Sequence, residues 1–262
     1  MRYALIAVIA AVAIGGSYYY WQTRMPSDQE KNSDMLKSDD GGGIVTEDAG
    51  YFENTRGFYA APKAPGNYPG VVMIHEWWGL NDHIRDMARE LARQGYRVLA
   101  VDLFGKVAAT PDEARSQVSG LDQAKATENL RAAAAFLRAQ GAGKLASLGW
   151  CFGGAQSLKL ALSGEKLDAT VIYYGNLVTD PAELKKITWP VLGIFGATDQ
   201  SIPVATVNMF RNALSSLGIR QSVHIYPGVG HAFANPSGMN YAPAETKDAW
   251  AKTVAFLAEH LK

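Results

Sequence analysis

The sequence has little of what several common kinds of protein require. A single cysteine among 262 residues excludes an intrachain disulfide and a cysteine-rich zinc site. The 25 Lys and Arg residues balance the 25 Asp and Glu residues and form no cluster, so nothing favours a nucleic-acid partner. No P-loop or metal-ligand spacing occurs, and Gly141 and Gly143 precede a predicted strand, whereas a dinucleotide fingerprint would follow one. We therefore expect neither a metal nor a cofactor.

The first 21 residues differ in kind from the rest of the chain. Arg2 precedes an apolar run over residues 3–14, which small residues and then a Tyr/Trp group follow. This layout is typical of a secretory signal peptide, or of an uncleaved membrane anchor over residues 3–21, and a buried helix is the alternative. The positive charges on either side of the run do not decide its orientation. We expect an exported catalytic domain, either periplasmic or anchored to the membrane and facing away from the cytoplasm.

The remainder divides into a linker and one domain. Residues 22–43 are polar, charged and finally glycine-rich, which predicts a flexible linker. Residues 44–262 have the pattern of a single globular domain, for which we expect a monomer.

Within residues 44–262, short apolar runs alternate with amphipathic stretches. After an early strand at residues 51–60, we predict further strands at residues 71–74, 98–101, 145–148, 170–174, 191–195 and 223–226. We predict helices from Asp82, as its cap, to Gly95, and over residues 124–140, 155–162 and 245–261. This order indicates an α/β fold with a mostly parallel, doubly wound sheet and helices on both faces. Such sheets carry their sites beyond the carboxyl ends of the strands.

The predicted strand at residues 145–148 leads directly into Gly149-Trp-Cys-Phe-Gly-Gly154. This is the form of a nucleophile elbow, with cysteine in the nucleophile's place. A helix N-terminus would follow Cys151 and stabilise its thiolate, and the Phe152 N–H would be one oxyanion donor. The alternative for Cys151 is a small buried hydrophobic residue.

A thiol nucleophile needs a base and an acid that orients the base. His231 lies on the loop after the last predicted strand, and Asp199 lies on the loop after the strand at residues 191–195. Their chain order of nucleophile, acid and histidine is that of α/β hydrolases. Asp180 is the rival acid, since it also follows a strand, and the alternative for His231 is a surface histidine.

These residues, together with His75-Glu-Trp-Trp-Gly-Leu-Asn81, resemble the dienelactone hydrolase family of the α/β-hydrolase fold over residues 44–262. The resemblance implies that Glu76 contacts the resting cysteine and takes its proton when substrate binds, and that the Trp77 N–H is the second oxyanion donor. An apolar setting would raise the pKa of Glu76 and suit it to that role, whereas the alternative is a solvated loop glutamate.

The chain departs from the family at the residues that bind the substrate carboxylate. The resemblance places arginines where this chain has Lys106 and Asn235. Neither side chain can make the bidentate hydrogen bonds that a guanidinium makes to a carboxylate. We expect Lys106, Asn235 and Trp78 to contact the substrate. The resemblance thus supports the fold and the thiol chemistry better than it supports dienelactone as the substrate.

We therefore expect a carboxylic ester or lactone hydrolase that uses a Cys151–His231–Asp199 triad and acts on a small molecule. One alternative is a tethered binding protein that keeps the fold without turnover. Another is a hydrolase of the thioesterase or peptidase type.

Overall fold

The computed structural model describes residues 43–262, and the predictions for the signal peptide or anchor and for most of the linker lie outside the described residues. No helix in that described range is both long and apolar enough to cross a membrane. The strands are β1 (Ile44–Phe52), β2 (Thr55–Pro62), β3 (Gly70–Ile74), β4 (Arg97–Ala100), β5 (Leu145–Trp150), β6 (Ala169–Tyr173), β7 (Val191–Gly196) and β8 (Gln221–Tyr226). The helices are α2 (Asp82–Arg93), α3 (Pro111–Ser119), α4 (Gln123–Ala139), α5 (Phe152–Leu162), α6 (Pro181–Leu184), α7 (Val204–Ser216) and α8 (Pro243–Leu261).

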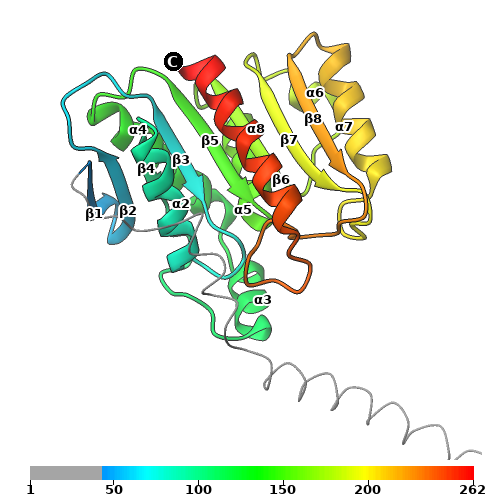
Figure 1. Cartoon of the computed structure of the whole chain (residues 1–262), viewed down its shortest axis with the longest axis horizontal. Helices are drawn as coiled ribbons and strands as arrows, with labels where there is room; N and C mark the ends of the chain where they lie inside the picture. Colours follow the sequence, from blue (N-terminus) through cyan, green and yellow to red (C-terminus); the bar gives the residue numbers. More distant parts are fainter. Residues whose placement is uncertain (1–42) are drawn as a thin grey trace, which may run out of the picture. The chain divides into compact units, whose positions relative to one another are not determined.

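The strands form one eight-stranded sheet in the order β1-β2-β4-β3-β5-β6-β7-β8 (Figure 1). Each neighbouring pair in the series β4-β3-β5-β6-β7-β8 is parallel. The β1–β2 hairpin joins this series by antiparallel pairing of β2 with β4. The α/β fold with a mostly parallel sheet is confirmed. The parallel strands bring their carboxyl ends to one edge of the sheet, which is where the site is expected.

Helices cover both faces of the sheet, and each face has its own hydrophobic core. Alternate residues of β3 point to opposite faces, with Val71 and Met73 in one core and Val72 and Ile74 in the other. Helices α2 and α8 contribute to the first core, and α4, α5 and α7 contribute to the second (Figure 1). A strand buried on both faces must be apolar throughout, and this explains the continuous apolar runs in the sequence.

Two predictions about individual elements are wrong. The single strand expected at residues 51–60 is a hairpin, because the chain reverses at Glu53, which takes a positive φ of 44°. The cap of α2 is Asn81, whose side chain accepts a hydrogen bond from the Ile84 N–H, and Asp82 is already the first helical residue. Gly95, with a φ of 87°, ends this helix as expected.

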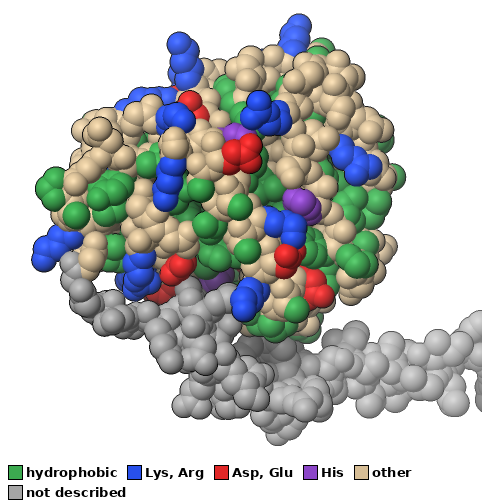
Figure 2. Space-filling model, turned by 45° about the horizontal axis from the view of Figure 1, so that its top comes forward, with side chains coloured by type: hydrophobic (Ala, Val, Ile, Leu, Met, Phe, Trp, Pro, Cys, Tyr) green, Lys and Arg blue, Asp and Glu red, His purple; other side chains and the backbone are tan. Residues whose placement is uncertain are grey.

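One face of the molecule shows how its charged side chains are distributed (Figure 2). On the face shown in Figure 2, Lys and Arg side chains stand singly or beside acidic ones and do not merge into one patch.

Candidate active site

Cys151 occupies a sharp turn between β5 and α5. Its backbone has a φ of 54°, a left-handed conformation that is costly for a residue with a side chain. The turn is tight enough to require glycine on both sides. A Cβ on Gly149 would lie 2.1 Å from the Gly153 carbonyl oxygen, and a Cβ on Gly153 would lie 2.3 Å from the Ile74 carbonyl oxygen. The glycines therefore let α5 begin directly above the sheet, with the thiol at its N-terminus.

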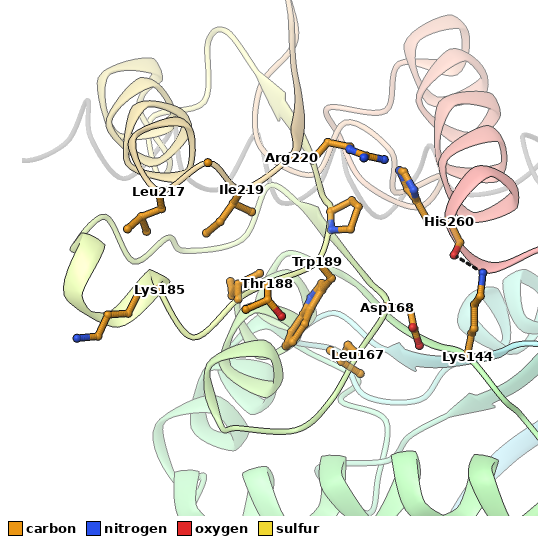
Figure 3. Close-up of a pocket in the computed structure, with 13 residues that line it drawn as sticks. Lys144, Leu167, Asp168, Lys185, Thr188, Trp189, Leu217, Ile219, Arg220 and His260 are labelled. Atoms are coloured by element: carbon orange, nitrogen blue, oxygen red, sulfur yellow. Dashed lines mark hydrogen bonds between the residues drawn. The ribbon is translucent and has the colours of Figure 1, made fainter.

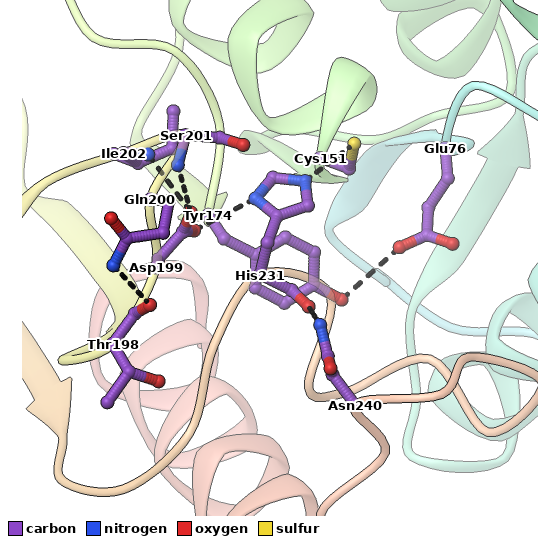
Figure 4. Close-up of polar contacts among 10 residues, drawn as sticks. All are labelled: Glu76, Cys151, Tyr174, Thr198, Asp199, Gln200, Ser201, Ile202, His231 and Asn240. Atoms are coloured by element: carbon purple, nitrogen blue, oxygen red, sulfur yellow. Dashed lines mark hydrogen bonds and ion pairs between the residues drawn. The ribbon is translucent and has the colours of Figure 1, made fainter. Parts of the chain in front are cut away.

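The thiol, the imidazole and the carboxylate predicted from the sequence lie together (Figure 4). His231 Nε2 lies 3.1 Å from Cys151 Sγ, and His231 Nδ1 lies 2.8 Å from Asp199 Oδ2. Asp199 is buried, and its other oxygen accepts the backbone N–H groups of Ser201 and Ile202. A carboxylate can only accept, so Nδ1 carries the imidazole proton and Nε2 is free to accept the thiol proton.

The rival acid has a structural function in the described fold. Asp180 caps the N-terminus of α6, where its carboxylate accepts the Ala182 N–H at 2.8 Å. His231 contacts Asp199 and not Asp180, so the geometry favours Asp199 as the partner of the imidazole.

Glu76 is buried beside the thiol and is not a solvated loop residue. Its carboxylate accepts hydrogen bonds from the Tyr174 hydroxyl, at 3.3 Å, and from the Asn235 amide. Burial raises its pKa to about 7, against the two hydrogen bonds, which lower it. The carboxyl group can therefore exchange a proton near neutral pH. The contact with the resting cysteine that the family resemblance implies is absent from the described hydrogen bonds, in which the thiol faces His231.

Cys151 rests as a thiol, whereas its place at a helix N-terminus suggests a thiolate. Burial, and next the negative charge of Glu76, raise the pKa of Cys151 to about 12. The backbone N–H groups of Phe152 and Trp77 act in the opposite direction, because both donate towards the sulfur. The two predicted oxyanion donors thus converge on the Cys151 sulfur, one from the α5 end and one from the loop after β3.

The three residues expected to bind substrate lie in different environments. Trp78 is half-buried, and its carbonyl accepts the Ala108 N–H at 2.8 Å, which holds the loop around Lys106 beside it. The Lys106 side chain is exposed. Asn235 is only 8% exposed, and both ends of its amide are engaged, one by Glu76 and the other by the Ser237 N–H. The structure therefore joins Asn235 to Glu76 and gives it no free group for a substrate.

The sequence analysis assigns no function to two residues near the site. Tyr174 follows β6 with a φ of 34°, and its ring meets the His231 ring edge-on at 5.3 Å while its hydroxyl reaches Glu76. His75 follows β3 and is fully buried. The available signal for both was their position at the carboxyl end of a predicted strand.

A separate cavity lies at the opposite edge of the sheet, where the parallel strands begin. The cavity has a volume of about 770 Å³, and Figure 3 shows residues that precede strands around it. Its lining includes Lys144 before β5, Asp168 before β6 and Arg220 before β8, and none of the predicted site residues. In residues 43–262, no group of three or more His, Cys, Asp or Glu side chains is placed to hold a metal ion.

The sequence relatives agree with this architecture. A protein of Salmonella typhimurium, named provisionally as a carboxymethylenebutenolidase, is 31% identical over 78% of this chain and 82% of its own length. Protein usf of Aquifex pyrophilus is 32% identical over 79% of this chain and 94% of its own length.

Solved structures give the same result. A provisionally assigned dienelactone hydrolase of Klebsiella pneumoniae superposes with a TM-score of 0.75 at 30% identity, covering 82% of this chain and 99% of that one. A dienelactone hydrolase-like promiscuous phosphotriesterase, P91, from metagenomic libraries has a TM-score of 0.75 at 27% identity, covering 84% of this chain and all of that one. The model of the dienelactone hydrolase family matches residues 55–261. The chain therefore belongs to the dienelactone hydrolase family.

Proposed function

We propose that this chain hydrolyses a carboxylic ester or a lactone through a thioester formed on Cys151. The contact of His231 with the Cys151 sulfur, at 3.1 Å, carries the proposal, because the same ring is oriented through its other nitrogen by Asp199.

In the first half of the reaction, the thiol proton passes to His231 Nε2 and the sulfur attacks the substrate carbonyl carbon. The carbonyl oxygen becomes negative and is stabilised by the N–H groups of Phe152 and Trp77. The bond to the leaving oxygen then breaks, and His231 returns its proton to that oxygen. The alcohol leaves, or stays attached to the acyl group if the substrate is a lactone.

In the second half, His231 takes a proton from water, and the resulting hydroxide attacks the thioester carbonyl. The carbon–sulfur bond breaks, the acid is released, and the proton returns to the sulfur. Ester and water are thereby converted into acid and alcohol.

We assign Glu76 an electrostatic function in this scheme. Its negative charge opposes the thiolate, and protonation, or movement away from the sulfur, removes that opposition. This assignment differs from direct proton transfer between Cys151 and Glu76, since His231 is the group in contact with the thiol.

The test is a substrate panel on the purified protein that contains neutral aryl esters, a carboxylate-bearing lactone, a thioester, a peptide and an aryl phosphotriester. We expect turnover of esters or lactones and its loss in Cys151→Ala by ~10⁴-fold or more. An unchanged rate in Cys151→Ala would refute the nucleophile. A preference for the thioester or the peptide would favour the other hydrolase type, and inertness throughout would favour the binding protein.

The substrate contacts proposed from the sequence can be tested on the same panel. We propose that Lys106 and Trp78 meet the substrate, because the loop of Lys106 is held against Trp78. Lys106→Ala should then lower kcat/KM for the carboxylate-bearing lactone more than for neutral esters. An equal effect on both substrates would remove Lys106 from the site.

We also propose that the domain acts outside the cytoplasm, as a monomer, after export or anchoring through residues 3–21. Fractionation of cells that produce the full chain should place it in the periplasm or on the membrane, and light scattering should give the mass of one chain. A cytoplasmic pool or a dimer would overturn the corresponding statement.

A further inference from the structure

His75 is a buried titratable residue that the reaction proposed above does not use. It follows the last residue of β3 and is completely buried between the loop that carries Glu76 and Trp77 and the loop that carries Leu103. The ring packs against two aromatic neighbours, with centroid distances of 5.0 Å to Phe104 and 6.0 Å to Phe152. These contacts fix the plane of the imidazole.

The contacts of the ring nitrogens define the tautomer. The Leu103 N–H can only donate, and it lies 3.2 Å from His75 Nε2, so Nε2 carries no proton. Burial lowers the pKa of His75 and keeps the ring neutral. The single ring proton is therefore on Nδ1, which donates to the Glu76 carbonyl oxygen at 2.6 Å.

That carbonyl belongs to the same peptide unit as the Trp77 N–H. A peptide unit is planar, so holding its oxygen also sets the direction of its N–H. A hydrogen bond accepted at the oxygen polarises the unit and strengthens the N–H as a donor. The Trp77 N–H donates towards the Cys151 sulfur, beside the place where a substrate oxygen would become negative.

We propose that His75 is a positioning residue, whose Nδ1–H holds the Glu76–Trp77 peptide so that the Trp77 N–H points at the developing oxyanion. The inference rests on the ester hydrolysis proposed above. It differs from a purely structural function because it predicts a loss that appears in the transition state and not in substrate binding.

Three substitutions separate the two contacts of the ring. His75→Leu removes both. His75→Asn keeps an N–H close to the position of Nδ1 and loses the acceptor for Leu103. His75→Gln places its polar group near Nε2 and loses the donor to the Glu76 carbonyl. His224→Asn is the matched control, since His224 lies on β8 and contacts Ser222.

We expect His75→Leu and His75→Gln to lower kcat about tenfold or more, with KM changed by less than about threefold. Removal of an oxyanion donor costs about 10²–10³ in rate, and loss of its orientation should cost part of that. His75→Asn should stay within about threefold of the wild-type kcat, and His224→Asn should match the wild type. Thermal unfolding of each variant is measured alongside. If His75 had a structural function alone, the variants would differ in unfolding temperature, but their kcat values would not follow the order expected here.

A second measurement does not depend on turnover. Cys151 is the only cysteine, so iodoacetamide reports on this thiol alone. Since the Trp77 N–H lowers the pKa of the thiol, its misorientation should slow alkylation at about pH 9 by roughly threefold in His75→Leu and His75→Gln, but not in His75→Asn.

The outcomes separate the two proposals. If the wild type cleaves no ester or lactone, the proposed function is wrong, while the alkylation rates still decide the function of His75. If His75→Gln recovers the wild-type rates and His75→Asn does not, the ring acts by holding Leu103 and the proposal is overturned. Equal rates in all variants would overturn it as well. If His75→Leu does not fold, the comparison of Asn with Gln decides.

Discussion

Burial and the negative charge of Glu76 oppose ionisation of the Cys151 thiol. The pKa of the Cys151 thiol is raised to about 12, so nearly all of the resting protein carries a neutral thiol. Labelling of Cys151 alone therefore cannot distinguish an enzyme from an inert binding protein with this fold. The distinguishing measurement is turnover, because the proposed reaction needs the thiolate only when substrate is bound.

Serine at position 151 should give a poor enzyme. A hydroxyl holds its proton far more tightly than a thiol, and the same burial and the same Glu76 charge oppose the alkoxide. We expect Cys151→Ser to lose about 10²-fold or more in kcat on the best ester while its thermal unfolding stays unchanged. A serine variant as fast as the wild type would show that the site does not depend on a thiol.

The hydroxyl of Tyr174 should set the pH at which Glu76 titrates. This hydrogen bond lowers the pKa of Glu76 from the value that burial alone would give. Its removal in Tyr174→Phe should move the inflection near pH 7 in kcat/KM to higher pH by about half a unit to one unit.

Controls for this shift are available in the chain. Glu76→Gln identifies the inflection, because glutamine does not titrate. Tyr173→Phe removes a neighbouring buried hydroxyl that contacts Thr253 at 2.6 Å, and it should leave the inflection in place. An equal shift in both tyrosine variants, or none in Tyr174→Phe, would contradict the assignment.

At the scale of elements, the junction of β5 with α5 tolerates no added atom at Gly153. A Cβ there would lie 2.3 Å from the Ile74 carbonyl oxygen and 2.4 Å from that of His75, and both are backbone atoms that cannot turn aside. We expect Gly153→Ala to lose roughly 3 kcal/mol of unfolding free energy and most of its activity. Gly143→Ala is the control, since a Cβ at Gly143 would meet nothing within 4 Å. Equal urea midpoints for the two variants would show that the elbow relaxes.

The elements that periodicity defines are also those that the sequence predicts well. Strands β3, β5 and β7 are buried along their whole length and read as apolar runs, so their positions and the elbow after β5 follow from the sequence. The hairpin at the sheet edge does not, because its reversal depends on a positive φ at Glu53 and not on a glycine. The pattern of residues in the sequence does not predict a turn of this kind.

The same limit applies to the site. Cys151, Asp199 and His231 could be chosen because each follows a strand and has reactive chemistry. Whether Asn235 faces the substrate or Glu76 depends on how the loop after β8 returns to the sheet, and no local pattern encodes that path. Tyr174 and His75 look like ordinary strand ends until tertiary contacts assign partners to their polar atoms.

At the scale of the whole molecule, the site exists only when the complete sheet has formed. Its groups come from the loops after β3, β5, β6, β7 and β8, which are far apart in the chain and meet only at the carboxyl edge. A partly unfolded chain therefore has no active fraction, and activity should follow global unfolding in denaturant.

Burial of Glu76 should reduce the stability of the whole fold as pH rises. Its pKa is 4.5 in ordinary surroundings and about 7 in the fold, so between these values the folded chain binds more protons than the unfolded chain. The free energy of unfolding should therefore fall with rising pH across this window, by about 3 kcal/mol from this group. Glutamine at position 76 does not titrate, so the free energy of unfolding of Glu76→Gln should rise relative to that of the wild type between about pH 4 and pH 7. Urea titrations across this range measure the difference. A constant difference between the two proteins would show that Glu76 titrates normally.

The neutral resting thiol also has a consequence for the lifetime of the protein. Peroxides and disulfides react with thiolates, so a sulfur held as a thiol by burial and by Glu76 is a slow target for oxidants. The chain has no second cysteine that could trap a sulfenic acid as an intrachain disulfide before it is oxidised further to the irreversible sulfinic or sulfonic acid. We expect hydrogen peroxide to inactivate Glu76→Gln faster than the wild type at neutral pH, as followed by the mass of the intact protein. The carboxylate that opposes ionisation of Cys151 would then also protect its sulfur from oxidants.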